Sequence, residues 1–162
     1  MPSDELLAGK NPVVVDPKAD LSLVARRVLW GRFSNAGQIC NCPEYVLVPE
    51  EVHGKLVETM KEVYVISPDT CLLPQTDIGD DRYASFYPGG AEKSHSFGRI
   101  VTTAHATRIK KLIDSTEGEI ICGGQCDVEN RFVAPTIVDN VHADDALMSE
   151  YVLCSLSALY GC

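Results

Sequence analysis

The sequence lacks several features that define common classes of protein. Its 162 residues hold only 14 lysines and arginines against 23 aspartates and glutamates, a net charge of −9 at pH 7. This balance argues against binding to nucleic acid or to an anionic membrane surface, because both need basic residues. No apolar run approaches the ~20 residues that cross a bilayer. Residues 1–5 (MPSDE) carry no basic or apolar leader, so we expect a cytoplasmic protein.

Cysteine pairs with zinc-binding spacing are also missing. The chain has seven cysteines, an odd number, and no two of them are separated by two residues. The spacings of Cys40 to Cys42 and of Cys122 to Cys126 are poor for zinc, and no histidine lies close to them in the sequence. We therefore expect no metal site. Most of these cysteines are expected to be reduced thiols that pack as small apolar side chains.

Strand-like and helix-like segments alternate along the chain. Short apolar runs predict strands at 11–16, 45–48, 119–122 and 132–138, and amphipathic periodicity predicts helices at 21–33, 50–64 and 102–115. Asp20 has the position of an N-cap for the first helix. The alternation predicts an α/β fold with an open, mainly parallel sheet and flanking helices. Because such a sheet has uncovered edges, we expect a homodimer.

The stretch 33–40 (FSNAGQIC) is the part of the sequence that most resembles a catalytic site. Cys40 follows a helix and a glycine-containing turn, where a thiol can project into a cleft beside backbone N–H groups that hold an oxyanion. Only the thiolate is nucleophilic, so such a site must favour the ionised form. The pattern makes Cys40 a candidate nucleophile, with an inert half-buried thiol as the alternative. Cys42, on the same face of an expected strand, is either a second thiol of the site or a core residue.

Two motifs resemble the aldehyde dehydrogenase family. Residues 9–16 (GKNPVVVD) are similar to the segment of that family that begins with a Glu-Leu-Gly-Gly-Lys motif, and residues 35–40 (NAGQIC) are similar to its Gly-Gln-x-Cys motif. The likeness extends over 45–62, 97–124 and 131–150, with the class 3 and fungal-type members as the best match. It implies the fold of the catalytic domain and a Cys40 thiol that adds to the carbonyl carbon of the substrate.

The departures from the family pattern concern cofactor and hydrolysis. Relatives pass hydride to NAD(P) and hydrolyse the thioester with a glutamate as base, but Leu6 stands at the place of that glutamate, with Glu5 beside it. Tyr151 stands where the family has a glutamate that holds the cofactor ribose. The coenzyme domain has no counterpart in the 162 residues. We therefore expect one truncated catalytic domain over 1–162, with an inserted loop at 65–96, a divergent tail at 151–162 and no cofactor.

The remaining candidates lie before the first motif, around Cys40 or in the long loop. Glu5 is a candidate base because it adjoins the place of the family's glutamate, and His95 is one because histidine is the usual activator of a thiol. The candidate residues for substrate binding are Asn35, Gln38, Trp30, Phe33 and Cys42. Core packing is the alternative for the two aromatic residues. His53 and His105 are expected to have surface or capping roles, and Asp144 and Asp145 to be solvated.

Three functions are compatible with these observations. The first is an aldehyde-dehydrogenase-like enzyme that works without NAD on a hydrophobic carbonyl compound or biosynthetic intermediate, by Cys40 addition or by non-redox cyclisation or dehydration. The second is a non-catalytic binding or dimerisation protein derived from an aldehyde dehydrogenase. The third is residual NAD(P)-dependent aldehyde oxidation with a partner chain. We prefer the first, because the motif around Cys40 is uninterrupted.

Overall fold

A five-stranded sheet forms the centre of the protein. The computed structural model describes residues 10–64, 66–67, 70–71, 91–149 and 156–161. The strand order is β1 (Pro12–Val14), β2 (Tyr45–Val48), β9 (Leu156–Gly161), β8 (Thr136–Asp139) and β5 (Glu119–Cys122). The first four run parallel, and only β5 pairs antiparallel, with β8. The α/β class and the mainly parallel sheet predicted from the sequence are confirmed.

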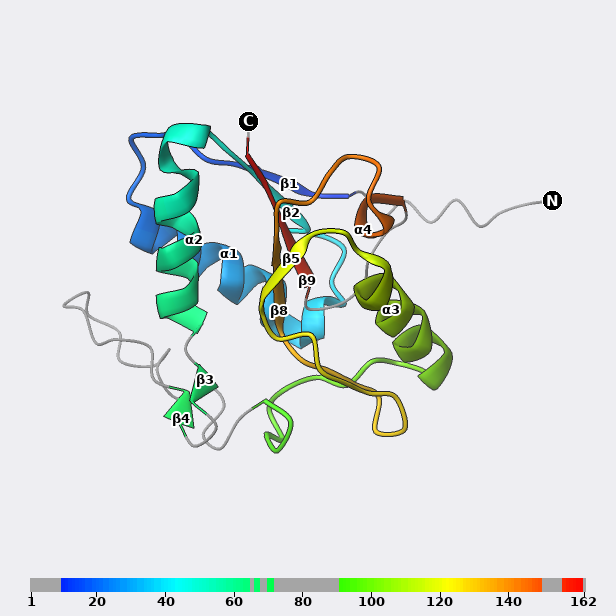
Figure 1. Ribbon diagram of the computed structural model, residues 1–162. Coiled ribbons are helices and arrows are strands. Elements are labelled where there is room, and N and C mark those ends of the chain that lie inside the picture. Colours follow the sequence, from blue (N-terminus) through cyan, green and yellow to red (C-terminus); the bar gives the residue numbers. More distant parts are fainter. Residues whose placement is uncertain (1–9, 65, 68–69, 72–90, 150–155, 162) are drawn as a thin grey trace.

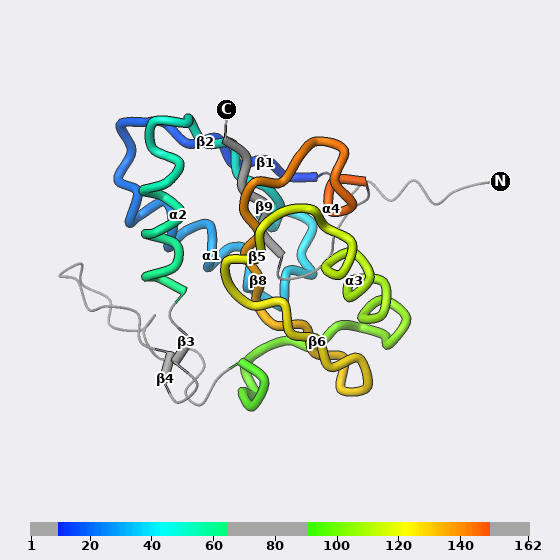
Figure 2. The backbone as a smooth tube through the Cα atoms, in the orientation of Figure 1, coloured from blue at the N-terminus to red at the C-terminus, as the bar shows by residue number. Residues whose placement is uncertain are grey.

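Helices cover both faces of this sheet. α1 (Leu21–Phe33) and α2 (Glu50–Tyr64) lie on one side, and α3 (Thr103–Ser115) with the short α4 (Ala146–Ser149) on the other (Figures 1 and 2). Successive residues of a strand point to opposite faces. Accordingly, Ile137 packs in the core beneath α1 and α2, and Val138 packs in the core beneath α3.

The helix starts follow from local sequence. The Asp20 side chain accepts hydrogen bonds from the N–H groups of Ser22 and Leu23, as predicted, and Thr102 caps α3 by accepting from the N–H of His105. α2 begins with Glu50 and Glu51, whose charges suit the positive end of the helix dipole. Each of these helices then buries one apolar stripe against the sheet.

Three parts of the chain differ from the sequence-based prediction or extend it. The strand expected at 132–138 is interrupted, with β7 (Phe132–Val133) paired to β6 (Cys126–Asp127) and β8 in the main sheet. The tail, predicted to diverge, supplies β9, which lies between β2 and β8 at the centre of the sheet. Of the loop expected at 65–96, the structure describes residues 91–96 and two short paired strands, β3 (Ile66–Ser67) and β4 (Thr70–Cys71).

No helix in the described ranges combines the length and the apolar character needed to cross a membrane.

Candidate active site at the Cys40 turn

A left-handed turn connects α1 to the candidate nucleophile. Asn35, Ala36 and Gly37 have φ values of 50°, 54° and 75°, a conformation that is unfavourable for residues other than glycine. Tertiary packing holds the turn in place, because Ala36 is buried in the core and Gly98 lies directly against it. A Cβ atom at Gly98 would come within 3.0 Å of the Asn35 carbonyl carbon. The helix predicted over 21–33 ends at Phe33 as expected, and the turn that follows it is strained in the way found at functional sites.

The Gln38 side chain joins this turn to the segment before α3. Its Nε2 donates to the backbone oxygens of Asn35 and Arg99, at 3.1 and 3.0 Å, and its Oε1 accepts from the Val101 N–H at 3.0 Å. Both ends of the amide are therefore engaged within the protein. Gln38 was predicted to bind substrate, but the structure gives its side chain a role in holding two segments together. Asn35, also predicted to bind substrate, is exposed, and its Nδ2 donates to the backbone oxygen of Gln38 at 3.3 Å.

Cys40 lies exposed at the tip of a second turn, closed by a 3.1 Å hydrogen bond from the Cys42 N–H to the Ile39 oxygen. The Asn11 side chain fixes this turn by two hydrogen bonds. Its Nδ2 donates to the Cys40 oxygen at 2.8 Å and to the Cys42 oxygen at 3.1 Å. Because Asn11 immediately precedes β1 and residues 44–45 lead into β2, pairing of these strands brings the two motifs together.

Cys42 has a different environment from Cys40. It is buried beneath the turn, 2% exposed, close to the buried side chains of Arg32 and Glu44. Burial raises the pKa of the Cys42 thiol, although the neighbouring Arg32 charge opposes the shift. The expectation that Cys40 and Cys42 share one face is wrong, because the chain reverses at the turn before β2 begins. Of the two roles expected for Cys42, its burial favours that of a core residue.

The other predicted residues that the structure describes form no hydrogen bond or ion pair with the Cys40 thiol. His95 is exposed, and no hydrogen bond or ion pair joins it to Cys40 in the described part of the chain. Glu5 lies outside the described residues. Phe33 packs into the core, edge to face with Tyr64 at 5.9 Å between ring centres, which favours the packing alternative for this residue. Trp30 is 57% exposed on α1.

Two large apolar side chains near the turn are exposed and were not identified from the sequence. Ile39, which precedes Cys40, is 37% exposed, and Val101 is 68% exposed. The hydrogen bond from the Val101 N–H to Gln38 places this residue beside the Cys40 motif, although 63 positions separate the two in the sequence. Exposed apolar side chains therefore flank the motif that contains Cys40. No sequence spacing could have linked Val101 to the motif.

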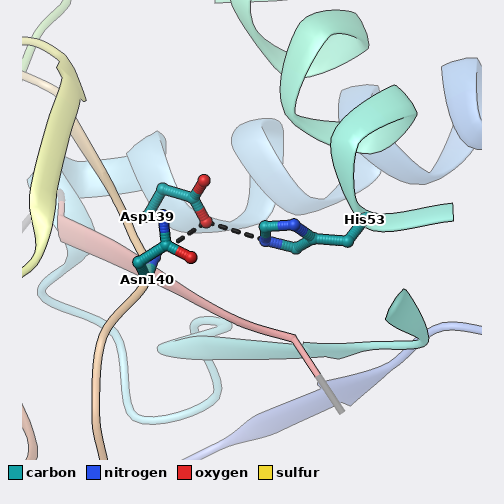
Figure 3. Close-up of polar contacts among 3 residues, drawn as sticks. All are labelled: His53, Asp139 and Asn140. Atoms are coloured by element: carbon teal, nitrogen blue, oxygen red, sulfur yellow. Dashed lines mark hydrogen bonds and ion pairs between the residues drawn. The ribbon is translucent and has the colours of Figure 1, made fainter. Parts of the chain in front are cut away.

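The histidine and acidic side chains form contacts elsewhere that sequence reasoning missed. His53 of α2 meets Asp139 at the end of β8 (Figure 3), with 2.8 Å between Nε2 and Oδ1. Asp145 is buried and accepts from Thr116 Oγ1 and from the N–H groups of Glu117 and Leu147. The prediction that Asp145 is solvated is therefore wrong, and His53, expected to have a surface or capping role, is half-buried with a partner that the sequence did not identify. The described residues contain no cluster of three or more His, Cys, Asp or Glu suited to a metal ion.

Three of the four described α-helices begin beside a carboxylate, which disfavours a pyrophosphate group at their N-termini. A pyrophosphate group binds well at a helix N-terminus that offers free N–H groups. Here α1 is capped by the Asp20 carboxylate, α2 begins with Glu50 and Glu51, and Asp145 occupies the start of α4. These carboxylates already accept the N–H groups or repel a second anion. The fourth helix, α3, is capped by Thr102.

Comparisons with known proteins show the family to which the chain is similar. Residues 5–154 match the aldehyde dehydrogenase family. The chain is 34% identical over 152 residues to aldehyde dehydrogenase 1 of Entamoeba histolytica, covering 94% of this chain and 25% of that protein. It is 35% identical over 154 residues to the beta-apo-4'-carotenal oxygenase of Neurospora crassa, covering 95% of this chain and 25% of that protein.

A solved structure shares the fold over the same extent. The substrate-bound state of Staphylococcus aureus AldH superimposes with a TM-score of 0.75 and 28% identity, covering 96% of this chain and 30% of that one. The chain thus spans about a quarter of the length of the curated relatives that it matches. Over that length it belongs to the aldehyde dehydrogenase family.

Proposed function

We propose that the chain binds apolar aldehydes covalently and reversibly through Cys40, without NAD. In this step the sulfur forms a bond to the carbonyl carbon, the carbon–oxygen π bond breaks, and the oxygen takes up a proton in place of the one that the thiol loses. The product is a hemithioacetal, and no electron acceptor is needed. The observation that carries the proposal is that Cys40 is exposed, on a turn fixed by hydrogen bonds from Asn11. The other three thiols that the structure describes are partly or fully buried.

Electrostatics near the thiol support this chemistry. The Cys40 backbone N–H makes no hydrogen bond to the described part of the protein, so it is available to an oxygen that gains negative charge. The two carbonyl oxygens of the same turn are engaged by Asn11. The turn therefore presents a hydrogen-bond donor, and not an acceptor, to the developing oxyanion.

The apolar neighbours Ile39 and Val101 support a hydrophobic substrate. Both are exposed, and burial of apolar surface contributes about 25 cal/mol for each Å² removed from water. An aldehyde with an alkyl chain gains this contribution, whereas acetaldehyde gains little. The same argument extends to apolar biosynthetic intermediates, for which the bound hemithioacetal or the shape of the site would favour non-redox cyclisation or dehydration.

The test is protection of Cys40 against alkylation. Iodoacetamide is added with increasing hexanal and no NAD, and the rate at each cysteine is followed by peptide mapping. We expect Cys40 to react faster than Cys42, Cys122 and Cys126, and hexanal to slow the reaction at Cys40 alone. A Cys40 rate that equals the others, or that millimolar hexanal does not change, would overturn the proposal. Mapping by residue also separates protection from imine formation at lysines.

Aldehyde oxidation with an added coenzyme-binding chain is the second candidate, favoured by membership of the family. The acidic helix starts argue against coenzyme binding by the described residues themselves. We expect no NADH or NADPH absorbance at 340 nm from this chain with hexanal and either coenzyme. Appearance of that absorbance would replace the NAD-free proposal by dehydrogenase chemistry.

Self-association is the third candidate, favoured by exposed apolar side chains on α1 and β1. Leu23 and Trp30 are seven residues apart, hence on one face of α1, and are 37% and 57% exposed. Val14, on the edge strand β1, is 75% exposed. We propose a homodimer, which sedimentation over a range of concentrations tests directly. Trp30 is the only tryptophan, so its emission would shift to shorter wavelength if the α1 face is covered. A monomer at all concentrations would exclude this candidate.

A further inference from the structure

Asn11 supplies both N–H donors of its side-chain amide to one turn. Nδ2 donates to the Cys40 oxygen at 2.8 Å and to the Cys42 oxygen at 3.1 Å, across 29 and 31 positions of sequence. Its backbone oxygen also accepts from the Glu44 N–H at 2.9 Å. Asn11 is thus the described residue that connects the start of β1 to the full length of the cysteine turn.

These bonds fix the direction of the peptide groups around the nucleophile. A peptide plane is rigid, so the Cys40 carbonyl that points toward Asn11 sends the Asn41 N–H of the same peptide the opposite way. The Cys42 carbonyl belongs to the peptide bond with Pro43, which has no N–H. The turn between Ile39 and Cys42 has a single internal hydrogen bond, and Cys40 is exposed, so local contacts leave the orientation of this turn weakly determined. The Asn11 amide provides the missing constraint, because it holds the carbonyl groups of Cys40 and Cys42 toward β1.

We infer that Asn11 is a positioning residue for covalent addition at Cys40. It makes no hydrogen bond to the thiol and acts through the backbone of the turn, because its bond to the Cys40 oxygen fixes the peptide that follows Cys40 and so the direction in which this residue presents its thiol. This inference rests on the proposed function. A purely structural role is the alternative, and it predicts that loss of the amide loosens the whole turn and exposes Cys42.

The experiment compares Asn11→Ala and Asn11→Asp with Asn41→Ala. Asn41 is an exposed asparagine of the same turn, next to Cys40, and its side chain makes no hydrogen bond to the described residues. Asn11→Asp keeps the size of the side chain and replaces the two donors by oxygen. In each variant, hexanal protection of Cys40 gives the aldehyde affinity, and the iodoacetamide rate at Cys42 reports whether the turn has opened.

We expect the hexanal affinity to fall about tenfold in Asn11→Ala, since two hydrogen bonds of ordinary strength are lost. The loss should be at least as large in Asn11→Asp. Asn41→Ala should stay within about twofold of the parent protein, and Cys42 should remain protected in all variants. Parent-like affinity in both Asn11 variants would overturn the inference, as would equal alkylation of Cys40 and Cys42 in them. If hexanal fails to protect the parent protein itself, the proposed function fails instead.

Discussion

His53 Nε2 lies 2.8 Å from Asp139 Oδ1 and thereby joins the first half of α2 to the end of β8 (Figure 3). The Asp139 carboxylate is buried, with its side chain 8% exposed, and the same oxygen also accepts from the Asn140 N–H at 2.8 Å. Asn140 itself adopts a φ of 53°. The contact therefore satisfies a buried carboxylate and fixes the chain where it leaves the sheet.

Replacement of His53 by alanine should destabilise the protein. Removal of the imidazole leaves Asp139 buried with one partner fewer, which costs about 1–3 kcal/mol. His105→Ala is the matched control, because His105 is exposed on α3 and only its backbone N–H takes part in the cap. Urea unfolding should show a clear loss for His53→Ala and a change within about 0.5 kcal/mol for His105→Ala. Equal midpoints would mean that the contact contributes nothing.

The same contact shows where inference from sequence ends. The helix at 50–64 was predicted with both of its ends, because an acidic start and a regular apolar stripe are local signals. The partner of His53 lies 86 positions away, and no spacing rule reaches that far. Asp144 and Asp145 make the point again, since one is exposed and the next is buried with three hydrogen bonds. Charge patterning cannot separate such neighbours.

The candidate site was predictable in part, because local sequence signals identify its thiol but not the distant segments that pack around it. Cys40 and its glycine turn are adjacent in sequence, so the exposed thiol beyond a helix could be expected. The holding contacts from Asn11, and those of Gln38 to Arg99 and Val101, depend on how distant segments pack. Strand β9 was missed because residues 156–161 lack the family pattern, although their apolar character is compatible with a central strand.

Gly123→Ala should be far more damaging than Gly124→Ala. Both glycines have positive φ, +80° and +90°, so both substitutions incur about 1–2 kcal/mol of backbone strain. Only at Gly123 would the added Cβ lie 2.0 Å from the Pro135 oxygen; at Gly124 its nearest neighbour is Ile120 Cγ2 at 3.4 Å. We expect Gly123→Ala to unfold at lower urea, with at least about 2 kcal/mol more lost than in Gly124→Ala. Similar losses of unfolding free energy in the two variants would show that the backbone at Pro135 and Thr136 moves aside at little cost.

Lys61 and Lys110 should control the reactivity of two different thiols. Burial raises the pKa of Cys122 and of Cys126, and the charges of Lys61 and Lys110, respectively, oppose these shifts. Lys61→Gln should therefore raise the pKa of Cys122 further and reduce its thiolate fraction at pH 8, with no effect on Cys126. Lys110→Gln should do the reverse.

The expected size of this change is about twofold in the iodoacetamide rate, because both lysines are exposed and their charges are screened. At 1 M salt, where the screening length is about 3 Å, the difference should disappear. Each variant is the control for the other. A change of both thiols in both variants would indicate a loss of packing, and would contradict the electrostatic explanation.

Val101→Ser should reduce the preference for aldehydes with long alkyl chains. Val101 is 68% exposed, and its backbone N–H is held at the Cys40 motif by Gln38, so the substitution removes apolar contact without disturbing that hydrogen bond. Loss of part of a valine contact is worth about a threefold to fivefold drop in affinity. Protection of Cys40 by hexanal should weaken by this factor, and protection by acetaldehyde should stay the same. Leu23→Ser, an exposed substitution on α1, is the control and should change neither aldehyde. If Val101→Ser weakens both aldehydes equally, the residue supports the turn and does not contact the alkyl chain.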